Sequence, residues 1–134
     1  MKLIALDVGE RRTGVALFDS QIDFVIPLDT IHHLSDDELF EAVGHILQQR
    51  SVHDVVIGLP LLLSGVEGSQ ARYAKQFGAQ LVSQGYNVSF IDERFTTDRH
   101  TPSDGDAKAA CIVLTTFLQQ NTSHVKKKMI KKKH

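Results

Sequence analysis

The chain has 134 residues, 42% of them hydrophobic and 23% charged, which is typical of one globular domain and not of a disordered or fibrous protein. Its formal net charge is −1. A single cysteine, Cys111, excludes an intrachain disulfide, no apolar run is long enough to span a membrane, and the N-terminal apolar run, interrupted by Asp7, is too short for a signal peptide. We therefore expect a cytosolic (cytoplasmic) protein without a membrane partner.

The charges are unevenly distributed along the chain. Residues 1–125 carry nine basic and sixteen acidic side chains, and six lysines follow at 126–128 and 131–133. We therefore predict a single domain over residues 1–120 and a basic, disordered tail over residues 121–134. Such a tail either holds a polyanion such as nucleic acid or is a solvated end that aids solubility.

Three strands are predicted at the start of the chain. Lys2–Asp7 is an almost continuous apolar run that ends in a carboxylate, as in a strand buried on both faces. A turn follows, and Thr13–Asp19 is predicted to return antiparallel to the first strand. Phe24–Ile31 is a weaker third strand, which Pro27 places at a sheet edge because proline cannot donate a backbone hydrogen bond.

Helices and strands alternate in the rest of the chain. The sequence from Ser35 to Glu38 is a capping box that starts a helix, and Gly85 closes a later one. The predicted elements are a helix over 36–50, a strand over Asp54–Leu59, a helix over 67–84, a strand over Asn87–Asp92 and a helix over 106–119.

The predicted order of elements is β-β-β-α-β-α-β-α, which defines an α/β fold. Right-handed crossovers make the last two strands parallel to the first. The antiparallel meander places the second strand between the first and the third. We therefore predict a five-stranded mixed sheet in the order 3-2-1-4-5, flanked by helices, in which the second strand alone runs antiparallel to the others.

Acidic residues gather where the predicted strands end. Asp7 ends the first strand, Asp92 and Glu93 lie at the end of the last strand, and Asp106 starts the last helix. Ligands of open α/β sheets bind at the carboxyl ends of parallel strands, and clustered carboxylates suit Mg²⁺ or Mn²⁺. Each acidic residue alone is also explained as a turn or helix-capping residue. Their convergence at one edge predicts a site for a pair of metal ions that hydrolyses phosphodiesters.

Four segments of the chain resemble motifs of the YqgF (RuvX) family. The first is Asp7–Ala16, which matches D-x-G-x-x-R-x-G-x-A. The others follow in family order and are Gly58-Leu59-Pro60 with Gly65 and Ser69-Gln70-Ala71, Asp92–Thr97 as D-E-R-x-T-T, and Asp106–Ala110 as D-x-x-A-A. The D-x-G motif alone is weak evidence, but four ordered matches over residues 2–118 are strong evidence.

The resemblance implies an RNase H-like fold, related to the Holliday junction resolvase RuvC, and a metal-dependent nuclease. The implied activity is 5′-end maturation of pre-16S rRNA in ribosome biogenesis, with Holliday junction resolution in recombination and repair as the alternative. The implied cofactor is Mg²⁺ or Mn²⁺, as two ions, and the implied partner is pre-rRNA or branched DNA. The carried-over residues are Asp7, Glu93 and Asp106 as catalytic metal ligands, and Arg12, Arg94, Thr96 and Thr97 as nucleic-acid contacts.

Some alternatives stay open at the level of sequence. Glu93 is preferred to Asp92 as a ligand because its longer side chain reaches further. Each arginine is equally explained by a surface ion pair, and the threonines by the end of a strand. His32 and His33 are neighbours in a strand, point to opposite faces and cannot chelate one ion together.

Two departures from the family leave the function and assembly open. The segment 98–105 is shorter than in relatives, which keeps a catalytically weak nucleic-acid-binding module as an alternative. A sugar-kinase-like or actin-like ATPase is not favoured, because 134 residues cannot supply its second domain. The apolar segment 61–63 either packs into the core or forms a partner surface, so the sequence leaves open whether the protein is a monomer or a weak dimer.

Overall fold

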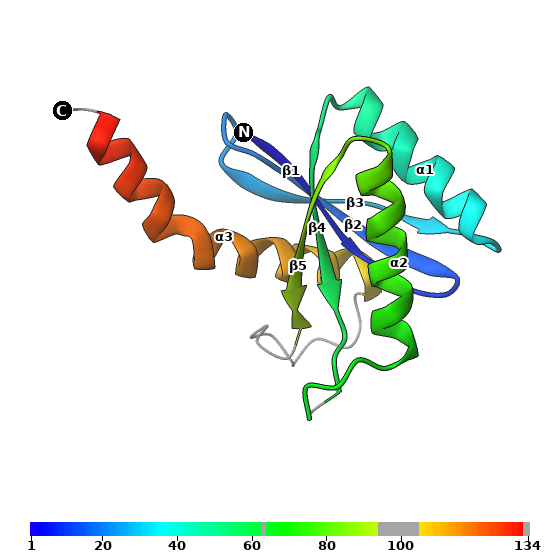
Figure 1. Cartoon of the computed structure of the whole chain (residues 1–134). Helices are drawn as coiled ribbons and strands as arrows, with labels where there is room; N and C mark the ends of the chain where they lie inside the picture. Colours follow the sequence, from blue (N-terminus) through cyan, green and yellow to red (C-terminus); the bar gives the residue numbers. More distant parts are fainter. Residues whose placement is uncertain (63, 94–104, 133–134) are drawn as a thin grey trace.

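The computed structural model describes residues 1–62, 64–93 and 105–132, and in the last helix it describes side chains for residues 107–121 (Figure 1). The elements follow the predicted order. They are β1 (Lys2–Asp7), β2 (Arg12–Asp19), β3 (Phe24–His32), α1 (Asp36–Gln49), β4 (Asp54–Leu59), α2 (Ser69–Ser83), β5 (Asn87–Asp92) and α3 (Gly105–Lys132). In the described part of the chain, no helix is long and apolar enough to cross a membrane.

The five strands form one sheet in the order β3-β2-β1-β4-β5, as predicted. Strand β2 pairs antiparallel with β1 and β3, whereas β4 pairs parallel with β1 and β5. Among the described strands, β2 is therefore the only one that runs antiparallel to the others, and β3, which contains Pro27, lies at an edge as expected. The carboxyl ends of β1, β4 and β5 consequently meet at the same edge of the sheet.

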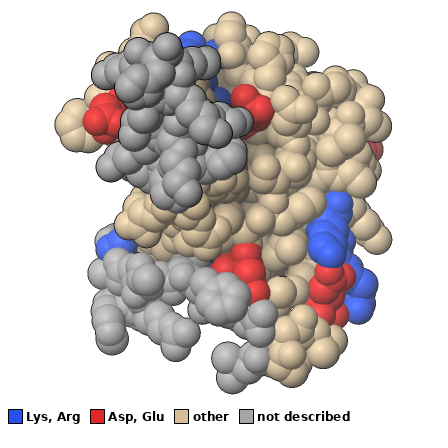
Figure 2. Space-filling model, turned by 60° about the vertical axis from the view of Figure 1, so that its left-hand side comes forward, with Lys and Arg blue, Asp and Glu red and all other residues tan. Residues whose placement is uncertain are grey.

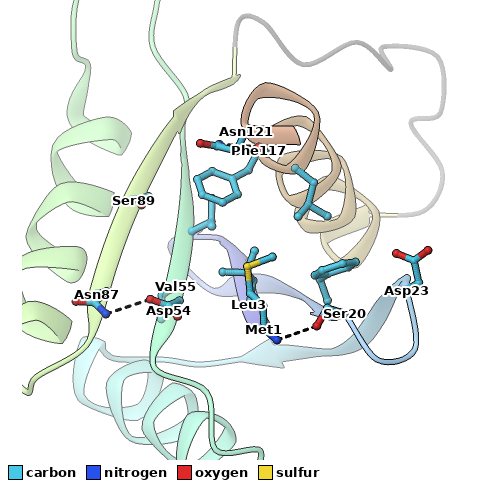
Figure 3. A pocket seen from close by; sticks show the side chains of 13 residues that line it. Met1, Leu3, Ser20, Asp23, Asp54, Val55, Asn87, Ser89, Phe117 and Asn121 are labelled. Carbon is cyan, nitrogen blue, oxygen red and sulfur yellow. Dashed lines mark hydrogen bonds between the residues drawn. The ribbon is translucent and has the colours of Figure 1, made fainter. Parts of the chain in front are cut away.

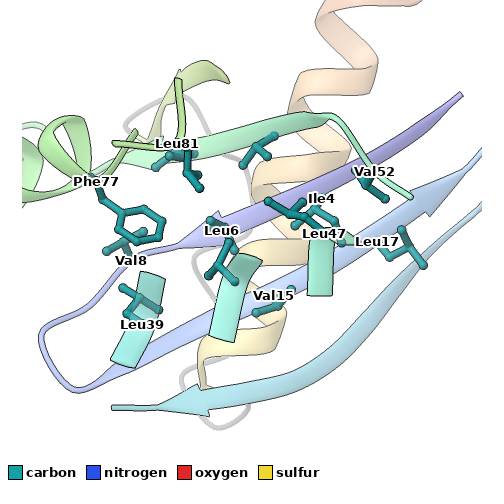
Figure 4. Close-up of a cluster of buried hydrophobic side chains, with 14 of the residues drawn as sticks. Ile4, Leu6, Val8, Val15, Leu17, Leu39, Leu47, Val52, Phe77 and Leu81 are labelled. Carbon is teal, nitrogen blue, oxygen red and sulfur yellow. The ribbon is translucent and has the colours of Figure 1, made fainter. Parts of the chain in front are cut away.

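Side chains along each strand point alternately to the two faces of the sheet, and a hydrophobic core forms on each face. In β1, Ile4 and Leu6 pack with α1 and α2 on one face, whereas Leu3 and Ala5 pack with α3 on the other. The first core is drawn in Figure 4. Strand β1 is thus buried on both faces, which explains its nearly continuous apolar sequence. The result is a three-layer arrangement with α1 and α2 over one face and α3 over the other (Figure 1).

The predicted capping box starts α1. The Ser35 hydroxyl accepts a hydrogen bond from the Glu38 amide at 3.2 Å, and the Glu38 carboxylate accepts one from the Leu34 amide at 2.7 Å. The reciprocal bond goes to Leu34, one residue earlier than in the standard motif. Two otherwise unsatisfied amides are therefore hydrogen-bonded where the chain enters α1.

A buried polar pair joins β2 to the end of β3. Thr13 and His33 are both almost fully buried, and the Thr13 hydroxyl is hydrogen-bonded to Nε2 of His33 at 2.9 Å. Burial, the largest influence, lowers the pKa of His33, because the charged ring is poorly solvated there. His32 is exposed, so the two histidines lie on opposite faces as expected.

The last helix is longer than predicted. We expected a helix over 106–119 and a disordered tail, but α3 continues to Lys132. No glycine or proline follows residue 119, so the local sequence contains only a weak decrease in helix preference and no strong helix stop there. The helix therefore extends past the predicted end at residue 119 and includes the lysines at 126–128, 131 and 132, whereas the disorder of the tail stays a prediction.

The apolar segment after β4 is divided between core and surface. Leu61 packs against the first core, whereas Leu62 is 55% exposed. Leu63 lies outside the described residues. The segment is therefore neither wholly core nor wholly a surface patch.

Candidate functional site

Two carboxyl groups meet at the carboxyl edge of the parallel strands. Asp7 ends β1 and Glu93 directly follows β5, and a hydrogen bond joins their side chains. Burial, this hydrogen bond, and repulsion from Asp7 and Asp92 raise the pKa of Glu93 from 4.5 to about 8. At neutral pH Glu93 is therefore mainly protonated, and its O–H group donates a hydrogen bond to the Asp7 carboxylate.

Strand alternation explains why Glu93 and not Asp92 reaches Asp7. Ala5, Val56 and Ile91 all belong to the core beneath α3. Two residues further along each strand, Asp7, Gly58 and Glu93 follow on the same face, because side chains alternate with a period of two. Asp92 follows on the opposite face.

Strand β4 lies between β1 and β5, so the Glu93 side chain has to pass over it to reach Asp7. Gly58 of β4 has no side chain at that point. A Cβ atom added to Gly58 would lie 2.5 Å from Oε1 of Glu93 and 2.8 Å from Cγ2 of Val113. Gly58 thus forms the floor of the space that holds the Glu93 carboxyl group.

Helix α3 approaches this edge with its N-terminal end. Val113 packs beside Gly58, near the carboxyl ends of the strands, whereas Phe117 and Asn121 line a cavity with Asn87 at the amino end of β5. The helix therefore runs from the carboxyl edge toward the amino edge. Its first residues, which include position 106, lie on the carboxyl side of Val113. The side chain of Asp106 is outside those described.

The predicted phosphate-contacting residues are only partly placed. Arg12 starts β2 and is exposed, and because β2 runs opposite to β1, this start lies at the same edge as Asp7. Arg94, Thr96 and Thr97 lie outside the described residues. Among the side chains that are described, no three His, Cys, Asp or Glu form a metal-binding group, and the predicted third carboxylate, Asp106, is not one of them.

A cavity of about 630 Å³ lies at the opposite edge of the sheet, between the strand starts and α3 (Figure 3). Its walls are mostly apolar and include Leu3, Val55 and Phe117. At the amino edge Asn87 donates a hydrogen bond to Asp54 at 3.1 Å, and the α-amino group donates to Ser20 at 2.8 Å. This cavity is remote from the Asp7–Glu93 pair and is no part of the candidate site.

A smaller cavity, of about 310 Å³, lies beside the turn that follows β1 and is lined by residues with polar side chains. Its lining includes Glu10 of that turn and Ser69 and Gln70 at the start of α2. At its side, the Tyr73 hydroxyl donates to Asp36 at 2.6 Å, and burial, the largest influence, with this hydrogen bond raises the pKa of Tyr73 to about 12. Tyr73 therefore stays neutral at physiological pH.

Lysine, arginine and acidic side chains occur in separate small groups on the face shown in Figure 2. Among the described residues of that face no continuous basic surface is visible. The six lysines near the C-terminus are the densest basic group in the sequence.

Sequence reasoning missed two polar features that shape this fold. One is the space above Gly58. A glycine that follows valines and an isoleucine in a buried strand could have indicated this space, because such a glycine often marks the close approach of another group to the backbone. The other is the buried Thr13–His33 pair. No local signal identifies it, since Thr13 lies in β2 and His33 follows the end of β3, twenty residues later.

Comparison with known proteins identifies the family. The family model described as "RuvX: Holliday junction resolvase" matches residues 1–120. A protein of Sulfurihydrogenibium sp. (strain YO3AOP1), described as "Putative pre-16S rRNA nuclease", is 33% identical over 133 residues, covering 89% of this chain and 90% of the relative. A relative of the same description from Anaeromyxobacter sp. (strain Fw109-5) is 31% identical over 132 residues, covering 88% of this chain and 96% of the relative.

Solved structures agree on the fold. Thermus thermophilus RuvC superimposes with a TM-score of 0.60 at 10% identity, covering 84% of this chain and 90% of RuvC. The fowlpox virus Holliday junction resolvase gives 0.55 at 9% identity, covering 90% of this chain and 99% of the resolvase. The fold is therefore RNase H-like, as predicted. By the family model and the relatives together, the chain belongs to the RuvX family.

Proposed function

We propose that this protein is a metal-dependent nuclease that hydrolyses phosphodiester bonds, with precursor 16S rRNA as its substrate and Asp7, Glu93 and Asp106 as its metal ligands. The observation that carries the proposal is the Asp7–Glu93 pair, two carboxyl groups in contact at the edge where α/β sheets bind ligands. The relatives' descriptions supply the substrate.

The pair fits a hard divalent cation. Two carboxylates in contact repel each other, and here a proton on Glu93 relieves the repulsion. A cation relieves it equally, and oxygen-only donors suit Mg²⁺ or Mn²⁺. The Asp7–Glu93 pair can therefore hold either a proton or a metal ion.

The course of α3 supports Asp106 as the third ligand. Val113 contacts the space beside Glu93, and position 106 lies two helical turns earlier, on the same side of the helix axis. Since α3 runs away from the carboxyl edge, its first turn belongs to that edge. Asp106 enters the proposal on this placement and on its match to the family motif.

Each residue has a definite task in the proposed reaction. Asp7, on the central strand, provides a rigid ligand, and Glu93 has to release its proton before it binds metal. A divalent metal ion held by these residues would supply neutralisation of the phosphate charge and activation of a water nucleophile. Arg12 and Arg94 would bind phosphate oxygens with their guanidinium groups, and Thr96 and Thr97 would donate hydroxyl hydrogen bonds.

Cleavage of four-way DNA junctions is the second candidate function. It is favoured by the description of the family model and by the fold shared with RuvC, which has been solved with a Holliday junction substrate. The two candidates share the same carboxylates and differ in the nucleic acid that is held.

A cleavage assay with Mn²⁺ tests the proposal. The substrates are RNA that carries the 5′ precursor of 16S rRNA and a four-way DNA junction, each beside a plain duplex. We expect wild type to cut the precursor RNA, and Asp7→Asn, Glu93→Gln and Asp106→Asn to lose cutting. Asp29→Asn, an exposed residue of β3, is the matched control and should cut normally. Cutting of the junction alone would select the second function, and no cutting of either would leave a binding module.

A further inference from the structure

We propose that Gly58 is a positioning residue of the carboxylate pair: its missing side chain leaves the space through which Glu93 crosses β4 to reach Asp7. The proposal rests on the proposed function only in treating that pair as a metal site. The contact between the pair and Gly58 is a feature of the fold itself.

The backbone gives no reason for a glycine at position 58. Gly58 lies within β4, the strand between β1 and β5, and pairs with Ile91 of β5; it is not among the described glycines with positive φ. Glycine weakens the interior of a strand, and the residues before it are Val55, Val56 and Ile57. The space that Gly58 leaves therefore has to matter more than the strand stability that it costs.

The contacts above Gly58 show which group uses this space. A Cβ atom there would lie 2.5 Å from Oε1 and 3.1 Å from Cδ of Glu93, and 2.8 Å from Cγ2 of Val113. Val113 is almost fully buried in the core beneath α3, whereas Glu93 has a flexible side chain. An added methyl group would consequently displace the Glu93 carboxyl group first, away from Asp7.

Two other glycines provide controls. A Cβ atom at Gly78 of α2 would lie 2.7 Å from Cζ of Phe90, so alanine there also overpacks, but on the opposite face and against apolar groups. A Cβ atom at Gly44 of α1 would meet nothing within 4 Å. Gly78→Ala thus controls for steric strain, and Gly44→Ala for the exchange of glycine by alanine.

A double-mutant cycle on metal-free protein tests the proposal without any catalytic readout. Gly58→Ala should lower the melting temperature by about 5 °C, as overpacking of a core does. In the Glu93→Ala background the same substitution should cost less than half as much, because the group that it displaces is gone. An equal loss in both backgrounds, or one relieved only by Val113→Ala, would overturn the proposal.

Metal binding gives the second readout. Mn²⁺ affinity, measured by electron paramagnetic resonance, should weaken by about 10- to 100-fold in Gly58→Ala, as for loss of a group that orients a ligand. Gly78→Ala and Gly44→Ala should bind Mn²⁺ as wild type does. If Asp7→Asn abolishes binding while Gly58→Ala leaves it intact, the positioning role is wrong.

The same experiment separates this proposal from the proposed function. If Asp7→Asn and Glu93→Gln both bind Mn²⁺ as wild type does, the pair is not a metal site and the proposed function fails. The melting-temperature cycle then still decides whether Gly58 makes room for Glu93.

Discussion

Replacing Glu93 with glutamine keeps the size of the side chain but removes its ionisation. In the folded protein the pKa of Glu93 is about 8, whereas its ordinary value is 4.5. A raised carboxyl pKa means that the folded state holds the proton more tightly than the unfolded chain does. The wild-type protein should therefore lose stability as the pH rises from about 4.5 to about 8, and the loss should be complete above that range.

The size of this effect follows from the two pKa values. At about 1.4 kcal/mol for each pH unit, the difference between them corresponds to at most about 5 kcal/mol. Glu93 is partly exposed, and solvent screening reduces the effect, so we expect about 2–3 kcal/mol. Glu93→Gln should match wild type near pH 4.5 and exceed its unfolding free energy by this amount at pH 8.5.

Urea denaturation in EDTA, at intervals between pH 4.5 and 8.5, measures the difference. The pKa of His33 is lowered, so the folded protein loses stability as the pH falls below 6.5. This loss occurs equally in wild type and in Glu93→Gln, so it cancels when the two unfolding free energies are subtracted. Glu41→Gln, at an exposed position of α1, is the matched control and should follow wild type. If the difference in unfolding free energy between Glu93→Gln and wild type is the same at every pH in this range, Glu93 is not a paired, partly buried carboxyl group with a raised pKa.

Three further predictions concern other parts of the molecule. Asp7→Asn should abolish Mn²⁺-dependent cleavage. In EDTA at pH 8.5, where Glu93 has lost its proton and the two carboxylates repel each other, Asp7→Asn should melt no lower than wild type, and a large drop in melting temperature would instead make Asp7 a structural residue. Deleting residues 122–134 should reduce the salt dependence of nucleic-acid binding, measured as the slope of the logarithm of the binding constant against the logarithm of the salt concentration. The slope should fall by up to about 5, at ~0.7–0.9 for each lysine–phosphate contact, and an unchanged slope would make the extension a solubility element. Thr13→Val should lower the free energy of unfolding, measured in urea at pH 8, by about 1–3 kcal/mol, because buried His33 loses a hydrogen-bond partner. The control Thr30→Val should lower it by less than about 1 kcal/mol. Equal losses would show that the Thr13–His33 hydrogen bond contributes little.

The sequence predicted the parts of the fold that depend on local or pairwise signals. The apolar run before Asp7 identified the central strand, Ser35 and Glu38 identified the start of α1, and Pro27 identified an edge strand. The predicted end of α3 at residue 119 was wrong, since the helix continues to Lys132. No glycine or proline marks the end of this helix, and the local sequence shows only a weak decrease in helix preference after residue 119.

The nearness of Asp7 and Glu93 was predictable from the sequence, but the way in which they make contact was not. Asp7 and Glu93 were expected to lie close together, and they are in contact. The protonation of Glu93 and the space above Gly58 depend on how β4 separates the two strands, and composition and spacing do not contain that information. The roles of Asp7, Glu93 and Asp106 as metal ligands stay predictions.

The strand order also has a consequence for folding kinetics. Strands β1, β2 and β3 follow one another directly, whereas β4 joins β1 only after the crossover through α1, and β5 joins β4 only after the crossover through α2. Contacts between residues distant in sequence form slowly, since the chain must first close a large loop. We therefore expect backbone amides of the meander to gain protection from hydrogen exchange before those of β4 and β5, and simultaneous protection would contradict this order. A chain that follows this order completes the Asp7–Glu93 contact in its last folding step, so partly folded molecules would have no assembled carboxylate pair.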